Sequence, residues 1–167
     1  EIYMIGLGDL TENCTPHFYE SQPHNVSLSL IEQYALARSM IMKTIDTFLP
    51  HADKLILAGA PGNHGEMSRT SKGQVATSRL DNSDTMHLQI CEEIMSANKE
   101  RYKNVTVDVP DGFHQVMTIK SIPCGWTHGH MSSGRGSNPE NKIENWWKGQ
   151  MYGFLPMSDV QILITGH

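Results

Sequence analysis

Four polar residues stand directly after short apolar runs of the chain and carry side chains that bind metal ions: Asp9, Asn63, His128 and His167. The carboxylate of Asp9 has two oxygens and can bridge two cations, the Asn63 amide offers a neutral oxygen, and the two imidazoles offer nitrogens. This mixed set suits manganese, iron, zinc or magnesium, and the absence of cysteine from the set argues against a structural zinc site. Two such ions about 3.5–4 Å apart clamp a phosphate, activate water and stabilise the leaving oxygen.

His64 directly follows Asn63 and is the candidate catalytic residue. We expect its imidazole to lie beside the phosphate rather than on a metal ion, where it protonates the leaving group or stabilises the transition state. On its own, an Asn-His pair after an apolar run is also typical of a simple turn. The order and spacing of all the candidates together favour the metal site.

Four more polar residues lie close to these positions along the chain, and we expect them to orient a ligand or contact the substrate: Glu12, Glu66, His130 and Arg135. For Glu12 a plain loop role is an equal alternative. Arg135 can pair with a phosphate, but a solvated position in its Ser/Gly-rich loop is the simpler interpretation. Taken alone, His130 could also be a surface residue.

The elements that must position these residues alternate between apolar runs and helical periodicity. Strands are expected over residues 2–7, 54–60, 105–109, 114–119 and 161–165, and residues 121–127 lead into His128. Helices are expected over residues 26–49, 84–99 and 139–152, the first with apolar residues at helical spacing and the second with an apolar inner face. Alternating strands and helices predict an α/β fold, in which ligands bind beyond the carboxyl ends of the strands. The four ligand candidates would then meet at one site.

Taken in order, four short motifs resemble those of the calcineurin-like metallophosphoesterase family: Gly8-Asp9, Gly62-Asn63-His64, His128-Gly129-His130 and Gly166-His167. The family pattern is D-x-H, G-D, G-N-H-E/D, H and G-H-x-H, and the match spans nearly the whole chain. The stretch GNHGE and the final ITGH look most like phosphoesterases of actinobacterial bacteriophages, which are described as similar to DNA repair exonucleases. The resemblance implies a four-layer α/β/β/α sandwich with the metal site at the carboxyl ends of the strands.

The resemblance also implies a role for each matching residue. Asp9 resembles the carboxylate that bridges two divalent ions, with manganese as the first expectation. Asn63, His128 and His167 resemble the remaining ligands of the second ion, and His64 resembles the catalytic histidine. The implied activity is metal-dependent hydrolysis of phosphate esters by a phosphodiesterase or DNA exonuclease-like enzyme. The alternatives are a phosphomonoesterase or cyclic-nucleotide phosphodiesterase at the same site, and a non-catalytic protein-interaction scaffold of the same fold.

The chain departs from the family pattern at both ends. It has no D-x-H motif before Asp9, and it stops at His167, so that the last His of G-H-x-H is missing. The third motif reads GNHGE rather than GNHE, which leaves the role of Glu66 open. We therefore expect residues 1–167 to be a single domain that is incomplete at both termini. We also expect the chain by itself to be weakly active or inactive, although the intact protein is an enzyme.

The overall composition limits the class of protein. The 167 residues fit one domain, and the net charge of −5 weakly disfavours a nucleic-acid partner, although it does not exclude a local basic groove. Cys14, Cys91 and Cys124 lack disulfide or zinc-knuckle spacing, which favours a reduced cytoplasm, of the host if a phage encodes the protein. No apolar run approaches the roughly 20 residues of a membrane helix. The oligomeric state is left open.

Two sets of aromatic and imidazole side chains have simpler interpretations than catalysis. We expect ordinary surface positions or hydrogen-bonded core positions for the remaining histidines: His17, His24, His51, His87 and His114. Trp146 and Trp147 lie side by side in the predicted helix 139–152 and could stack on bases, but their helical spacing from other apolar residues favours the core for one of them.

Overall fold

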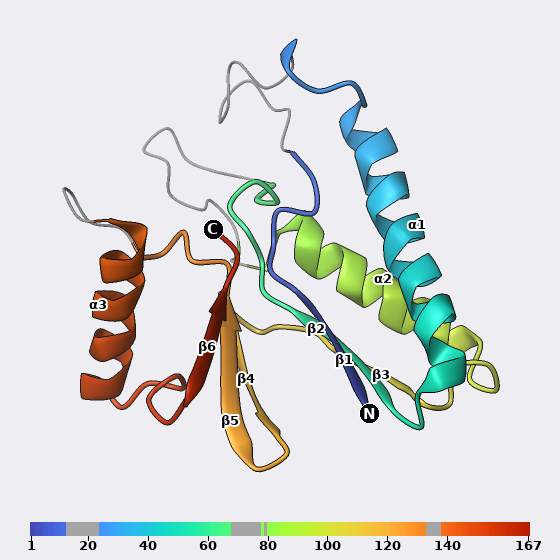
Figure 1. Cartoon of the computed structure of the whole chain (residues 1–167). Helices are drawn as coiled ribbons and strands as arrows, with labels where there is room; N and C mark the ends of the chain where they lie inside the picture. Colours follow the sequence, from blue (N-terminus) through green and yellow to red (C-terminus); the bar gives the residue numbers. More distant parts are fainter. Residues whose placement is uncertain (13–23, 68–77, 79, 133–137) are drawn as a thin grey trace.

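Two three-stranded sheets and three α-helices make up this mixed α/β protein, in a computed structural model that describes residues 1–12, 24–67, 78, 80–132 and 138–167 (Figure 1). The first sheet contains β1 (Ile2–Gly6), β2 (Leu55–Gly59) and β3 (Val105–Asp108), all parallel and in that order. The second contains β4 (His114–Ile119), β5 (Ile122–Thr127) and β6 (Ile162–Thr165); β4 runs antiparallel to β5, and β6 runs parallel to it. The expected strands are confirmed, with small shifts of their ends.

The helices are α1 (Leu30–Phe48), which a short 3₁₀ segment η2 (Leu49–His51) follows, α2 (Ser83–Ala97) and α3 (Pro139–Tyr152). Helix α1 begins later than the predicted residue 26 because Ser29 and Glu32 form a capping box, in which each side chain accepts a hydrogen bond from the other residue's backbone N–H. Asn82 and Asn138 are the N-caps of α2 and α3, and the side chain of each accepts one backbone N–H hydrogen bond from the first turn of its helix.

The central strand β2 is buried on both faces and separates two apolar clusters. Leu55 and Leu57 pack with the cluster that α1 and α2 form on one face of the first sheet. Ile56 and Ala58 point the other way and pack with Trp126 of β5, so the second sheet covers this face. Helix α3 lies beside the second sheet, on the side away from α1 and α2 (Figure 1). Burial on both faces is what a parallel strand requires.

Strands β3 and β4 are consecutive in the chain but lie in different sheets. The Pro110-Asp111-Gly112 segment between them therefore carries the chain from the first sheet to the second instead of closing a hairpin. Because β4 and β5 are antiparallel, the start of β4 lies beside the end of β5, where His114 pairs with Thr127.

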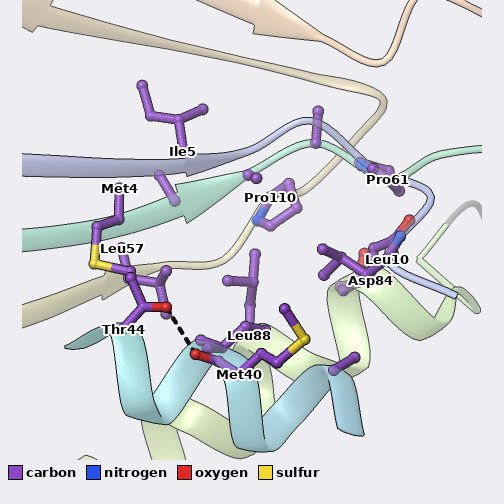
Figure 2. A pocket seen from close by; sticks show the side chains of 18 residues that line it. Met4, Ile5, Leu10, Met40, Thr44, Leu57, Pro61, Asp84, Leu88 and Pro110 are labelled. Carbon is purple, nitrogen blue, oxygen red and sulfur yellow. Dashed lines mark hydrogen bonds between the residues drawn. The ribbon is translucent and has the colours of Figure 1, made fainter. Parts of the chain in front are cut away.

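Part of the apolar stripe of helix α1 is exposed to solvent. Ala37 and Ile45 are buried, but Ile31 is 79% and Met40 is 61% exposed. Between α1 and the first sheet lies a cavity of about 280 Å³ with largely apolar walls (Figure 2). The apolar spacing along α1 thus indicates a helix, but part of its apolar stripe is exposed.

Cys91 and Cys124 are buried free thiols, as the spacing predicts, while Cys14 lies outside the described residues. None of the helices in the described part of the chain is long and apolar enough to cross a membrane.

Candidate metal centre

Three of the four predicted metal ligands meet where the two sheets end. Asp9 follows β1, His128 follows β5 and His167 follows β6, and one potential ligand atom from each lies within 4.8 Å of the other two. Nε2 of His128 lies 2.9 Å from Oδ2 of Asp9 and 3.2 Å from Nδ1 of His167. Each sheet thus contributes to one group of a carboxylate oxygen and two imidazole nitrogens. Among the described residues, no other three His, Cys, Asp or Glu side chains bring their ligand atoms this close together.

The ring of His128 is oriented by a backbone carbonyl. Its Nδ1 lies 2.6 Å from the carbonyl oxygen of Leu7, and the side chain is almost fully buried. Because a carbonyl oxygen can only accept a hydrogen bond, Nδ1 must carry the proton. In the neutral ring Nε2 then presents its lone pair toward Asp9 and His167. Such a hydrogen bond from the second ring nitrogen is typical of metal-binding histidines.

Asp9 and His128 shift each other's pKa in opposite directions. Burial by itself would raise the pKa of Asp9, but hydrogen bonds from His128 and from the His64 backbone hold it below its ordinary value. Burial by itself would lower the pKa of His128, but its hydrogen bonds to Asp9 and to the Leu7 carbonyl hold it above its ordinary value. Both shifts stabilise a charged pair, in which one proton occupies the space between a carboxylate and an imidazole.

Two glycines allow the loops that carry Asp9 and His64 to approach each other. Gly8 has a φ of +83°, and a Cβ there would lie 2.9 Å from Nδ1 of His128. A Cβ on Gly62 would overlap the carboxylate of Asp9. Asp9 itself has a φ of +53°, an uncommon left-handed conformation for a residue with a side chain. Backbone strain of this kind tends to persist at functional sites.

Asp84, in the first turn of α2, holds the two loops together. Its carboxylate accepts three backbone N–H hydrogen bonds, from Asp9 at 3.0 Å, Leu10 at 3.0 Å and Gly62 at 2.8 Å. Burial raises the pKa of Asp84, and the three N–H donors offset part of that effect. The sequence did not identify this residue, because an acidic side chain in the first turn of a helix is typical of simple capping.

Asn82, the cap of the same helix, completes this connection. Its side-chain amide donates to the Gly62 carbonyl at 2.8 Å, and its amide oxygen accepts from the Asp84 backbone at 2.9 Å. The side chain is buried. The N-terminus of α2 thus fixes the backbone on which Asp9 and His64 are carried.

The candidate catalytic residue His64 contacts the site on two sides. Its backbone N–H donates to Oδ1 of Asp9 at 2.9 Å, and its ring Nδ1 lies 2.6 Å from Oε1 of Glu12. Since a carboxylate can only accept, Glu12 favours the tautomer with the proton on Nδ1. Asn63 lies between Gly62 and His64 in the chain, and its amide oxygen is buried. Its role as a ligand stays a prediction.

The other two described support candidates lie behind the ligand group. The ring of His130 packs 5.4 Å from that of His128 and 5.2 Å from that of Phe113, measured between centroids. Nε2 of His130 lies 3.9 Å from Oε1 of the buried Glu66. Their burial favours a supporting position over direct substrate contact. Arg135 lies outside the described residues.

The expectation of ordinary surface or hydrogen-bonded core positions for the remaining histidines is wrong for one of them and agrees with the structure for two others. His87 is fully buried, and neither ring nitrogen has a hydrogen-bond partner among the described residues, so it is not a hydrogen-bonded core histidine. His24 and His51 are exposed, and His17 lies outside the described residues. Trp146 and Trp147 are both half-exposed, so the expected core position of one of them is not confirmed. Nε1 of Trp147 donates to the Met157 carbonyl at 3.2 Å.

No protein-family model matches the chain, and comparison with curated proteins and with solved structures gives no match.

Proposed function

We propose that the protein is a metal-dependent phosphoesterase in which Asp9, His128 and His167 hold one of two divalent cations. The observation that carries the proposal is the convergence of their ligand atoms within 4.8 Å. The donor chemistry fits a cation: the Leu7 carbonyl keeps the proton of His128 on Nδ1, so Nε2, Asp9 and His167 can present lone pairs to one point. The mixed oxygen and nitrogen set suits Mn²⁺, with Fe, Zn²⁺ or Mg²⁺ as alternatives.

A divalent cation held there would supply a Lewis acid that withdraws negative charge from a phosphoryl group. The protein's own residues would perform the remaining steps. Asp9 fixes the ligand group to the first sheet, and Glu12 keeps Nδ1 of His64 protonated and the ring oriented. A proton at Nε2 of a charged His64 would then pass to the oxygen of the departing alcohol, as general acid catalysis requires.

A phosphodiester is the substrate that we propose, because the order of the motifs resembles that of calcineurin-like metallophosphoesterases. The arrangement of two sheets between α1 and α2 on one side and α3 on the other supports the four-layer sandwich that this resemblance implies. DNA as the physiological phosphodiester, with an exonuclease-like activity, is the narrower form of the proposal.

Metal binding tests the first half of the proposal. Calorimetric titration of the chain with Mn²⁺ should show a saturable site that His128→Ala abolishes. The exposed His51 provides a matched control, and His51→Ala should bind as the unaltered chain does. Equal binding by all three forms would place the metal elsewhere and would remove the basis of the proposal.

Turnover by the protein tests the second half. With Mn²⁺ it should hydrolyse bis-nitrophenyl phosphate faster than nitrophenyl phosphate, and His64→Ala should lower kcat by roughly 100-fold or more. Preference for the monoester would identify a phosphomonoesterase. Metal binding without hydrolysis of either compound or of linear DNA would favour the non-catalytic scaffold.

A further inference from the structure

The side chain of Gln33 connects helix α1 to the loop that follows Asp9. Its amide oxygen accepts a hydrogen bond from the backbone N–H of Glu12 at 2.8 Å, and its amide nitrogen donates to the carbonyl of Leu28 at 3.1 Å. Glu12 and Gln33 are 21 residues apart in the chain. One half-buried amide thus ties the loop to the beginning of a helix.

The chemistry of the two partners fixes the orientation of this amide. The Glu12 N–H can only donate and the Leu28 carbonyl can only accept, so the amide cannot flip without losing both bonds. Leu28 directly precedes Ser29, whose capping box with Glu32 defines the first turn of α1. The beginning of α1 therefore provides a rigid support from which Gln33 holds the Glu12 backbone.

The Glu12 backbone matters because its side chain contacts the candidate catalytic histidine. Oε1 of Glu12 lies 2.6 Å from Nδ1 of His64, although the two side chains are 31% and 21% exposed. Water has access to both groups, and a mobile Glu side chain loses rotamer entropy when it is held in one geometry. Fixing the Glu12 backbone removes one source of that mobility and favours a single orientation of the His64 ring.

We propose that Gln33 is a positioning residue for the Glu12–His64 pair, through which helix α1 sets the tautomer and orientation of His64. The proposal rests on the proposed function in one respect: it assumes that His64 acts in proton transfer. Gln33 is not one of the proposed metal ligands, and its side-chain amide forms hydrogen bonds with the backbone of Glu12 and Leu28. Its effect should therefore appear at His64 and leave the metal site unchanged.

The first experiment examines His64 directly and needs no activity. Nitrogen–proton correlation spectra of the chain should show the His64 ring, assigned by its loss in His64→Ala, protonated at Nδ1. In Gln33→Leu this signal should shift toward the average of the two tautomers, while Mn²⁺ affinity measured by calorimetry stays the same. Gln89→Leu makes the same chemical change at an exposed position of α2 and should leave the spectrum unaltered.

The second experiment measures turnover of the protein. We expect Gln33→Leu to lower kcat roughly 10- to 100-fold with little change in KM, because a misoriented proton donor acts on the chemical step. Gln33→Glu keeps the acceptor for Glu12 but loses the donor to Leu28, and it should give an intermediate kcat.

The two proposals fail in different ways. An unchanged His64 spectrum and kcat in Gln33→Leu, together with a large loss of kcat in His64→Ala, would overturn the role of Gln33 alone. An unchanged kcat in His64→Ala would overturn the proposed catalytic mechanism instead. A loss of kcat in Gln33→Leu with an equal loss of Mn²⁺ affinity would show general damage to the site and would also overturn the positioning role.

Discussion

Nε2 of His128 lies 2.9 Å from Oδ2 of Asp9, and this contact joins the end of β5 in the second sheet to the end of β1 in the first. The proton between the two atoms occupies the place that a cation would take. A metal ion and this proton therefore compete for the same pair of atoms. The contact favours the proton in this competition, because it holds the pKa of His128 above its ordinary value and that of Asp9 below it.

Metal affinity should consequently fall as the pH falls through the raised pKa of His128. Asp9 stays ionised over this range, so the loss comes from the imidazole, and below that pKa affinity should drop about tenfold per pH unit for the one proton displaced. Calorimetry with Mn²⁺ between pH 8 and pH 5.5, in two buffers of different ionisation enthalpy, measures both the affinity and the proton released. An affinity that does not change over this range, with no proton released, would contradict the assignment of His128 as a ligand.

Removing the charge of Asp84 should weaken both the fold and the metal site. In Asp84→Asn one oxygen is replaced by an N–H₂ group that faces backbone donors, so at least one of the three N–H hydrogen bonds is lost. We expect a decrease of about 1–3 kcal/mol in the free energy of unfolding and a weaker affinity for Mn²⁺, because the Asp9 and Gly62 loops lose their common support. Urea unfolding and calorimetry measure the two effects. The exposed Asp53 offers the matched control, Asp53→Asn, and equal behaviour of the two variants would contradict the role of Asp84.

The positions of Asp9, His128 and His167 were predictable because each follows an apolar run, and strands of α/β folds end at a common edge. The sequence contains this information locally, as a hydrophobic run followed by a ligand. It does not contain the hydrogen bonds that hold the site, since Asp84 looks like an ordinary helix cap and Gln33 like a surface residue of a helix. Both residues form hydrogen bonds with loops that are distant in the chain, and the hydrophobic periodicity of a sequence does not predict such partners.

The exposure of α1 and the separation of β3 from β4 were unpredictable for a related reason. The apolar spacing of α1 indicates a helix, but the fraction of its stripe that is buried depends on how closely the sheet approaches it. Two strands joined by a Pro-Asp-Gly segment are typical of a hairpin, but here the two strands belong to different sheets. In both cases the tertiary packing, rather than the local sequence pattern, determines the structure.

Gln115 should contribute to stability because it bridges the two sheets below the metal site. Its amide oxygen accepts from the backbone N–H of Gly59 at 3.1 Å and from Nε1 of Trp126 at 3.2 Å, and its nitrogen donates to the Asp108 carbonyl at 3.2 Å. Gln115→Leu leaves two buried donors without this acceptor, at a cost of about 1–3 kcal/mol each. Gln161→Leu, at an exposed position, is the control for urea unfolding. A loss below 1 kcal/mol would mean that the bridge is dispensable.

His87 should make the protein less stable in mild acid. Burial lowers its pKa, and nearby Arg38 acts in the same direction while Asp84 opposes it; the ring also packs edge-on against Tyr34, with centroids 5.7 Å apart. The folded state thus keeps His87 neutral where the unfolded chain, with a pKa of about 6.5, already binds a proton. Since the unfolded state binds more protons, stability falls as the pH drops below about 6.5.

The variant His87→Leu isolates this effect, because it removes the titrating group while the opposite contribution of His128 stays in both proteins. That contribution, from a raised pKa, is present below about pH 6.5 and is lost as the pH rises through the folded-state value. Urea unfolding at pH 7 and pH 5 should show a smaller loss of stability for His87→Leu than for the unaltered chain. At pH 7 the variant should be at least as stable, because leucine has no buried nitrogen that needs a partner. Equal losses in the two proteins would mean that His87 finds a partner on protonation, with Asp84, one helical turn before it, as the nearest acceptor to examine.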